Sequence, residues 1–565
     1  MNVSNDAGHY VVIGLGHIGS RVVSLLHKLG RRVVVITDST KELWLRAARD
    51  AGAQVILGDA RNDERLHEAG LDSAAALLVL TDSDLTNLEI VLDARKMRAD
   101  LPIVARIFDQ TLARHLEDAL DLRRALAVSA IAAPAFAAGA LGEQIAGAFQ
   151  LEHQVMLLGR LTINGSSKLI GCTPATASKE HGLELLDAHL RDEHSRNTAL
   201  GENSLITGVA ERDDWLQLLA KHAEKEENAT RKNSLWMALG LIGQSWTNAP
   251  PALRVLTSAL ATLIALSVLV FRFGMDLSLI DAIYFIITTV TTTGYGDITP
   301  KDSGTALKLY ACILMMLGSA STAVLYSFVT DFVIAERFKA VLGKQKKPAR
   351  HHTILVGLGN LGMRVATELQ RAHAAHLVIE RDPNDDFIEA IRTETAVING
   401  DGRLVATLRE AGIDKASAII AATGDDAVNL GVALEARRHN PKLRTIVRLF
   451  DADLARKVQE GMRIDAALSA SAIAAPVFVA AALHPHVVAA TVIGDDLLTL
   501  CVHEPKQEWI GKTPAEVRAS TGIDIVMRRG VTSDSFGRPA PNVPLTGGER
   551  LLVAMRDRLV GCAPP

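Results

Sequence analysis

Residues 288–297 read Thr-Thr-Val-Thr-Thr-Thr-Gly-Tyr-Gly-Asp, and two apolar runs, 255–271 and 306–334, lie on either side of this stretch. Each run, with its flanks, is long enough to cross a bilayer as a helix. Residues 277–291 predict a short helix whose negative C-terminal dipole end faces the loop. Glycine lets successive carbonyls point along one axis, so such a loop can replace the water around a dehydrated cation.

The segment Thr292-Thr293-Gly294-Tyr295-Gly296 resembles the filter signature of potassium channels, usually Thr-Val-Gly-Tyr-Gly. Thr293 stands where valine is commoner, and because the ion faces the backbone carbonyl, we expect selectivity for potassium to survive. Asp297 either hydrogen-bonds behind the filter or is a solvated charge at its mouth. The resemblance implies four identical loops around one axis, and since the chain supplies one loop, it implies a homotetramer with K⁺ in the filter.

Within the second apolar run, Gly318 lies near the middle. Glycine lowers helix stability relative to alanine, so it marks either a bending hinge for gating or a close helix contact. No helix with repeated arginines is present, which argues against intrinsic voltage gating.

Composition agrees with a membrane part inside a soluble majority. The chain has 565 residues, 48% of them hydrophobic, a mean hydropathy of +0.18 and a net charge of −4. This charge gives no reason to expect a nucleic-acid partner. The cysteines are scattered without metal-ligand spacing, which indicates packing residues in a reducing compartment.

The N-terminal region predicts an α/β fold. Strand-like Val11–Ile13 precedes Gly14-Leu15-Gly16-His17-Ile18-Gly19, and a helical run and a second strand follow. This order brings backbone amides and a helix N-terminus to a phosphate. The acid that binds ribose in dinucleotide folds is replaced by Thr37, with Asp38 next, so we expect weaker binding or a preference for a 2′-phosphate or a mononucleotide.

Further strands alternate with helices, which predicts a parallel, doubly wound sheet. The alanine-rich run 127–149 predicts one buried helix, a candidate dimer helix. Residues 151–215 hold short strand-like runs and predict a small second lobe.

The region after the second apolar run repeats the first. At an offset of 342 or 343 residues, Gly357-Leu358-Gly359-Asn360-Leu361-Gly362 matches the first glycine turn, and 473–478 matches 131–136. So many matches in register indicate two copies of one domain. The second copy has Glu380 at the ribose-acid position, which makes it the better nucleotide site.

Both copies resemble the regulator-of-potassium-conductance domain, also called the TrkA-type nucleotide-binding domain. The chain resembles a two-span bacterial potassium channel with one copy before the pore and one after it, whereas related channels usually carry the domain only after the pore. The resemblance implies duplicated Rossmann-like domains, each with a small C-terminal lobe, around an all-α two-helix pore module. The expected boundaries are 8–150 and 151–220 for the first copy, 221–250 for a linker with an interfacial helix, 251–340 for the pore, 341–350 for a linker, and 351–490 and 491–565 for the second copy.

The resemblance also implies an adenine nucleotide, such as NAD(H), ATP, ADP or AMP, and eight domains in a tetrameric gating assembly. A divalent cation also occurs in this family, but no acidic cluster here has recognisable ligand spacing. The strand-end residues either contact ligand or form surface ion pairs. The candidate nucleotide-binding residues are Gly14, Gly16, His17, Gly19, Asp38, Asp59, Arg106, Gly357, Gly359, Asn360, Gly362, Glu380, Asp401 and Arg448.

The predicted function is a ligand-gated potassium channel in the bacterial inner membrane. Basic residues 344–350 after the second span indicate that both termini are cytoplasmic. Residues 235–246 form either an interfacial helix or a core helix. The alternatives are a regulatory subunit of a potassium uptake system and a nucleotide-dependent oxidoreductase, but no readable catalytic motif supports an enzyme.

Overall fold

The structure is a computed structural model, and two compact units divide it: residues 1–222 with 345–565, and residues 223–344. The charged run 221–233, the apolar segment 235–246 and the lysines at 344–347 lie outside the residues that the structure describes. The described residues are 8–141, 145–151, 154–163, 169–186, 199–201, 205–211, 215, 251–341, 348, 350–531, 533, 535–537, 539–540 and 542–559.

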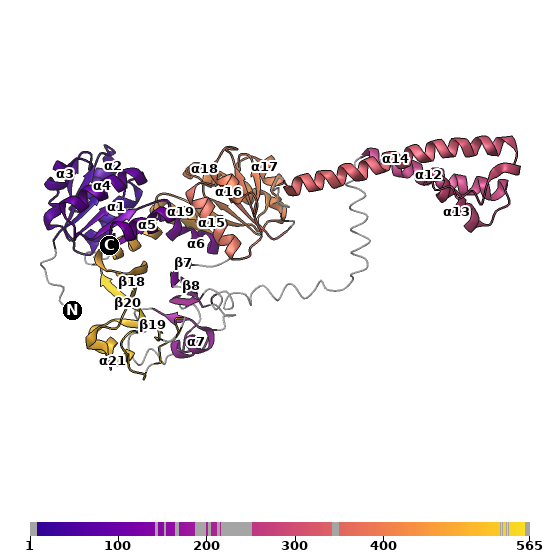
Figure 1. The fold of residues 1–565 in the computed structure, drawn as a ribbon. Coiled ribbons are helices and arrows are strands. Elements are labelled where there is room, and N and C mark those ends of the chain that lie inside the picture. The colour runs from indigo at the N-terminus through magenta and orange to yellow at the C-terminus, as the bar shows by residue number, and fades with distance from the viewer. Residues whose placement is uncertain are drawn as a thin grey trace. The chain divides into compact units, whose positions relative to one another are not determined.

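The first unit contains two six-stranded parallel sheets of the same topology, ordered β3-β2-β1-β4-β5-β6 and β13-β12-β11-β14-β15-β16 (Figure 1). Their inner strands are rich in valine, isoleucine, leucine and alanine and are buried on both faces, as parallel sheets require, whereas the edge strands are partly exposed. The duplicated doubly wound fold is confirmed. The strands of the first sheet are β1 Tyr10–Ile13, β2 Val33–Thr37, β3 Gln54–Leu57, β4 Ala76–Val79, β5 Ile103–Arg106 and β6 Arg124–Leu126; those of the second are β11 Thr353–Val356, β12 His376–Glu380, β13 Ala396–Asn399, β14 Ala418–Ala421, β15 Arg444–Arg448 and β16 Ala466–Leu468.

Helices follow the strands in the same order in both copies. The N-caps of α4 and α18 are Ser83 and Asp425, whose side chains accept hydrogen bonds from backbone amides of the first turn. The helices are α1 His17–Lys28, α2 Glu42–Asp50, α3 Asp63–Glu68, α4 Asp84–Met97, α5 Gln110–Ala119 and α6 Val128–Leu141 in the first copy, and α15 Asn360–Arg371, α16 Asp386–Ile391, α17 Val405–Glu410, α18 Asp426–His439, α19 Ala452–Gly461 and α20 Ala470–Leu483 in the second.

The alanine-rich helices α6 and α20 each pack on the other copy. Phe136 of α6 shares a core with Val365 of α15, and Phe478 of α20 shares a core with Val22 of α1. Both phenylalanines are fully buried. The helix that the sequence marked as a dimer helix therefore pairs the two copies within one chain.

The prediction of one helix over 127–149 was wrong at its C-terminal end. Helix α6 ends at Leu141, and β7, Ile145–Leu151, pairs antiparallel with β8, Gln154–Thr162. Alanine in 145–149 is compatible with either state, and the strand wins because its residues complete a sheet with β8.

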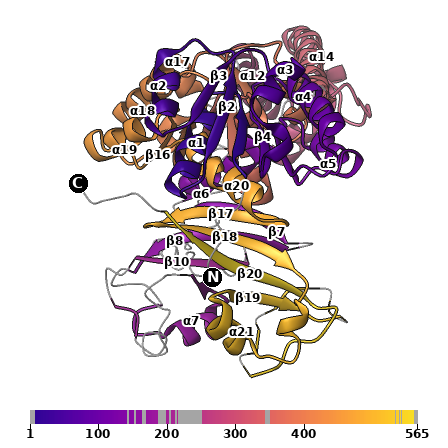
Figure 2. The ribbon, with the colours of Figure 1, turned by 90° about the vertical axis from the view of Figure 1, so that its left-hand side faces the viewer.

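Each copy has a small lobe built on a four-stranded antiparallel sheet, ordered β7-β8-β10-β9 and β17-β18-β20-β19. Phe149 and Leu158 of the first sheet share a core with Leu498 and Phe536 of the second lobe. Figure 2 shows β7, β8, β17 and β18 layered together. The remaining lobe elements are β9 Glu184–Leu185, β10 Leu205–Glu211, α7 Pro174–His181, β17 Val487–Ile493, β18 Asp496–His503, α21 Pro514–Thr521, β19 Asp524–Arg529 and β20 Arg550–Arg558.

The second unit holds three helices, α12 Pro251–Gly274, α13 Leu279–Val290 and α14 Thr305–Val341. Among the described residues, one helical segment, Thr305–Val324 of α14, is long and apolar enough to cross a membrane, and Ser258–Gly274 and Leu279–Val290 are shorter apolar helices. The 24 residues of α12 measure about 36 Å, more than a hydrocarbon core of about 30 Å.

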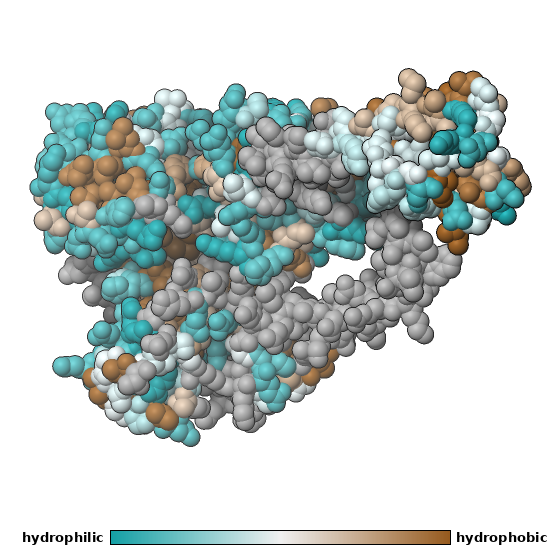
Figure 3. Space-filling model, turned by 45° about the vertical axis from the view of Figure 1, so that its right-hand side comes forward, coloured by the Kyte–Doolittle hydropathy of each residue, from teal (hydrophilic) through white to brown (hydrophobic). Residues whose placement is uncertain are grey.

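The helices of this unit pack on one another through a small core that includes Phe271, Phe285 and Leu314. The hydroxyls of Ser267 and Tyr310 add a hydrogen bond of 2.9 Å between α12 and α14. Many large apolar side chains remain exposed, and Figure 3 shows hydrophobic side chains on the surface of this unit. They include Leu266, Leu269, Phe273, Ile280, Ile287, Leu309, Ile313 and Met316.

Candidate functional sites: a filter loop and two nucleotide pockets

The filter loop begins where the short helix α13 ends, as the sequence predicted. The amides of Thr293 and Gly294 both donate to the carbonyl of Thr288, at 2.9 and 3.1 Å. Thr292, Gly294 and Gly296 have φ angles of 60°, 49° and 78°. This left-handed backbone is why glycine recurs in the loop.

Polar and aromatic side chains brace the loop. The hydroxyls of Thr293 and Thr291 lie 3.0 Å apart, within hydrogen-bond distance. The rings of Tyr284 and Tyr295 are nearly parallel, 6.5 Å between centroids. Thr293 therefore takes a hydrogen bond that valine cannot make, and Tyr295 stacks on a tyrosine of the short helix.

Gly318 of α14 lies against the end of α13. A Cβ atom at Gly318 would stand 3.1 Å from Val290 Cγ2 and 3.3 Å from Val290 Cα. The hydroxyl of Thr322, one turn later, donates to the carbonyl of Val290 at 3.2 Å. Of the two readings of Gly318, this geometry supports close helix contact, and its role as a hinge stays a prediction.

Both glycine turns have the backbone that a phosphate loop needs. Gly14 and Gly357 have φ angles of 90° and 96°. A Cβ at Gly19 or Gly362 would stand 2.0 Å from the carbonyl oxygen of the first glycine of its turn. Helices α1 and α15 thus start directly at the turn, and Gly16 and Gly359 precede their first residues as N-caps without side chains. The free N-terminal amides are suited to bind an anion.

The second-copy pocket is a cavity of about 540 Å³, within the usual range for small-molecule sites. Glu380 lies at the end of β12, where the sequence predicted a ribose-binding acid. Its carboxylate accepts hydrogen bonds from the amides of Leu358 at 2.7 Å, Arg381 at 2.7 Å and Asp382 at 3.0 Å. The predicted residues that line this cavity are Gly357, Gly359, Asn360, Glu380, Asp401 and Arg448, together with Arg106 of the first copy.

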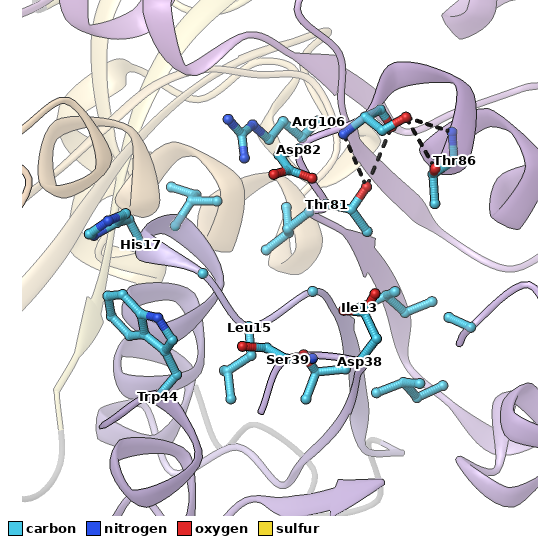
Figure 4. A pocket seen from close by; sticks show the side chains of 18 of the residues that line it. Ile13, Leu15, His17, Asp38, Ser39, Trp44, Thr81, Asp82, Thr86 and Arg106 are labelled. Carbon is cyan, nitrogen blue, oxygen red and sulfur yellow. Dashed lines mark hydrogen bonds between the residues drawn. The ribbon is translucent and has the colours of Figure 1, made fainter. Parts of the chain in front are cut away.

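The first-copy pocket has a volume of about 480 Å³ and different polar groups (Figure 4). Thr37 replaces the acid, is buried, and accepts a hydrogen bond from the amide of Ser39 at 3.1 Å. His17 lies edge-on to Trp44, with 4.8 Å between ring centroids. The predicted residues that line this cavity are Gly14, Gly16, His17, Asp38, Asp59 and Arg106, together with Arg448 of the second copy.

Each pocket is completed by the other copy, which sequence reasoning missed. Phe450 and Ser471 line the first-copy pocket, and their counterparts Phe108 and Ser129 line the second. His17 stacks on Phe450 with 4.7 Å between ring centroids. The available signal was the repeated Arg-x-Phe at 106–108 and 448–450, but repeats do not show that two copies exchange walls.

Arginine side chains of α1 and α15 hold the copies together at these walls. Arg21 donates to Ser471 Oγ at 3.1 Å and to the carbonyl of Phe450 at 3.2 Å. Arg364 makes the matching bonds to Ser129 Oγ at 3.0 Å and to the carbonyl of Phe108 at 3.1 Å. The pairing is thus nearly two-fold symmetric, as expected for duplicated domains.

Asp59 and Asp401 each pair with an arginine two residues later, and both carboxyls also line a cavity. The hydrogen bonds from Arg61 and Arg403 lower the pKa of the two carboxyls. Burial, together with the positive charge of Arg21, lowers the pKa of His17. Within the described part of the chain, His, Cys, Asp and Glu form no group of three or more that could hold a metal ion.

Comparisons with known proteins agree with this architecture. The TrkA-N domain family matches residues 10–125 and 353–470, and the family described as "Ion channel" matches 255–335. "Probable potassium channel protein 2" of Methanocaldococcus jannaschii is 30% identical over 189 residues, 32% of this chain and 53% of that relative. "Voltage-gated potassium channel Kch" of Escherichia coli is 29% identical over 187 residues, 32% of this chain and 44% of that relative.

The chain thus spans about half the length of these curated relatives. Among solved structures, "GsuK channel bound to NAD" has a TM-score of 0.51 and 17% identity, and covers 98% of this chain and 77% of that chain. This similarity concerns the fold. The chain thus carries two TrkA-N domains, one before and one after a single domain of the ion channel family.

Proposed function

We propose that four copies of this chain form a potassium-selective pore in a membrane and that nucleotide binding controls it. The filter loop carries the proposal. It lies at the C-terminal end of a short helix, between two apolar helices, and every second residue from Thr292 to Gly296 has a left-handed φ angle. A backbone of this kind can point successive carbonyls along one axis. One chain supplies one loop, so a closed ring of carbonyls needs several chains.

The exposure of the filter supports assembly. The side chain of Tyr295 is 72% exposed in the single chain, whereas a filter tyrosine must pack against neighbours to hold the ring of carbonyls at the radius of the ion. Neighbouring subunits would cover it. The exposed apolar residues of α12, α13 and α14 would then contact lipid or other subunits.

Control by an adenine nucleotide follows from the two pockets. The glycine turn, the free helix N-terminus and Glu380 fit the phosphate and ribose of such a ligand. The related fold was solved as a channel bound to NAD. A ligand that binds one shape of the paired domains tenfold better supplies about 1.4 kcal/mol per site to shift the pore. The basic residues after the second span support cytoplasmic termini at a bacterial inner membrane.

The test is ion flux through the purified full-length chain in liposomes, with potassium or sodium as the driven ion. We expect potassium flux to exceed sodium flux and to change when ADP or NAD is added on the domain side. Thr293→Val should keep the selectivity because the carbonyl remains. Gly296→Ala should abolish selectivity, since a side chain is strained at a φ of 78°. Equal flux of both ions through the unmodified protein would refute the pore assignment, and no response to either nucleotide would refute the control.

A further inference from the structure

The residues shared by the two nucleotide pockets indicate which copy supplies the positive charge for the phosphate of a ligand. Arg106 and Arg448 each line both cavities. Arg106 is the last residue of β5, and Arg448 is the last residue of β15. Each arginine thus lies at the edge of its own sheet that the glycine turn of the other copy faces. A ligand in either cavity therefore has an arginine of the other copy on its border.

The two guanidinium groups are held in place by aromatic rings, and each keeps a buried N–H donor without an acceptor. Arg106 lies over the ring of Phe108 at 4.4 Å, and Arg448 over that of Phe450 at 4.5 Å. The Nε atoms of both arginines are buried without a hydrogen-bond partner, while Arg448 Nη1 donates to the carbonyl of Thr423 at 3.3 Å. The charges that act on them are carboxylates of their own copies: Asp82 and Asp84 on Arg106, and Asp426 on Arg448. A buried N–H donor without an acceptor lowers the stability of the folded protein, and an anionic ligand that accepts a hydrogen bond from it would remove this cost.

Buried asparagines fix the backbone from which the arginines project. Asn429 Nδ2 donates to the carbonyl of Arg448 at 3.1 Å, and Asn429 Oδ1 accepts from the amide of Thr423 at 2.9 Å. Asn87 makes the same bridge to Arg106, at 2.8 Å. The strand ends that carry the arginines are thus tied to the neighbouring strands before any ligand binds.

The inter-copy bonds bring the arginine of one copy to the turn of the other. Arg21 holds the carbonyl of Phe450, and His17, the first residue of α1, stacks on the ring of Phe450, over which Arg448 lies. The glycine turn and helix N-terminus of the first copy therefore face a cation of the second copy across the cavity.

We propose that each pocket is completed by the arginine of the other copy: Arg448 binds the phosphate of a ligand held by the first glycine turn, and Arg106 binds that of a ligand held by the second. This rests on the proposed nucleotide binding and extends it. A phosphorylated nucleotide in either pocket then bridges the copies that precede and follow the pore, so its binding energy acts on their pairing. The ligand class is a nucleoside diphosphate or a dinucleotide, since both place phosphate at the helix N-terminus.

The test uses proteins with one working pocket. Gly359 has open space around its Cβ position and a φ of −63°, so Gly359→Asp fits without strain. Aspartate also serves as an N-cap and puts negative charge where a phosphate would bind. Gly16→Asp, at a φ of −112° with equally open space, does the same in the first copy. The Gly359→Asp protein thus keeps only the first-copy pocket able to bind, and the Gly16→Asp protein keeps only the second-copy pocket.

Calorimetric titration of the full-length protein in detergent with ADP, and separately with NAD, measures each remaining pocket. In the Gly359→Asp protein, Arg448→Gln should weaken binding about tenfold or more, the usual loss for a hydrogen bond to a charged group. Arg438→Gln is the control, because Arg438 is an 80% exposed arginine of the same copy; it should change nothing. In the Gly16→Asp protein, Arg106→Gln should give the corresponding loss.

The inference is overturned if Arg448→Gln leaves the Gly359→Asp protein unchanged, or weakens binding only in the Gly16→Asp protein, because each arginine then serves its own copy. Arg448→Lys keeps the charge and should restore part of the affinity, which loss through misfolding would not allow. If the unmodified protein binds neither ADP nor NAD, the proposed nucleotide control itself fails, and this result is distinct from the first two.

Discussion

Replacing Arg364 by alanine should loosen the contact between the two copies, and Arg364 itself lines neither nucleotide pocket. Arg364 lies on α15, and its guanidinium donates to Ser129 Oγ at 3.0 Å and to the carbonyl of Phe108 at 3.1 Å, both in the first copy. Burial lowers the pKa of this guanidinium, so part of the gain from the hydrogen bonds offsets the cost of removing the charge from water.

The size of the effect follows from these contacts. A hydrogen bond with one charged partner contributes about 1.5–3 kcal/mol to stability. Both bonds of Arg364 are of this kind, since the donor is charged and the acceptor is neutral. The alanine variant also avoids the cost of removing the guanidinium from water, so the net loss is smaller than two full hydrogen bonds. We expect the free energy of association of the two copies to weaken by about 2 kcal/mol. Amides of α6 whose exchange requires separation of the copies should then exchange about 30-fold faster.

Hydrogen exchange of the full-length protein, followed by mass spectrometry of α6 peptides, measures this change. Arg371→Ala is the control, because Arg371 lies on the same helix, is 61% exposed and pairs with Glu368 of that helix; it should have little effect. Equal exchange in the two variants would refute the pairing of copies within one chain. In a double-mutant cycle with Ser129→Ala, the two effects should not add.

Three further predictions concern the turns, the half-buried His376 and the pore helices. Gly362→Ala should abolish nucleotide binding to the second copy in calorimetric titration, because its Cβ would stand 2.0 Å from a carbonyl oxygen, whereas Gly359→Ala, with open space, should bind nearly normally; equal affinity would contradict this account of the turn. Burial lowers the pKa of His376 below 6.5, so below pH 6.5 the unfolded chain takes up a proton that the folded chain does not. The melting temperature should therefore fall between pH 7.5 and 5.5, and fall less in His376→Gln; an identical fall would exclude this histidine as a cause. Gly318→Ala should lower the melting temperature of the pore unit because its Cβ meets Val290 at 3.1 Å, and adding Val290→Ala should restore it; a variant as stable as the unmodified protein would show that the contact has room to spare.

Local pattern was enough to predict the repeated sheets, since valine and isoleucine runs that alternate with helices leave few other folds. It was also enough to predict the position of Glu380, because the glycine turn and the second strand are separated by one helix of ordinary length. The end of α6 could not be predicted in this way. Residues 145–149 become a strand only because β8 is available to pair with them.

The sequence by itself determined the filter segment, the two glycine turns and the duplication, because each depends on residues close together in the chain. Only the tertiary structure decided that α6 and α20 exchange partners, that Phe108 and Phe450 each border the pocket of the other copy, and that the two strand-end arginines border both pockets. Residues 450 and 235 positions apart hold these walls together, Arg21 with Ser471 and Arg364 with Ser129. Their contact depends on which apolar faces of the two copies pack together closely, and the pattern of residues within one segment does not determine this.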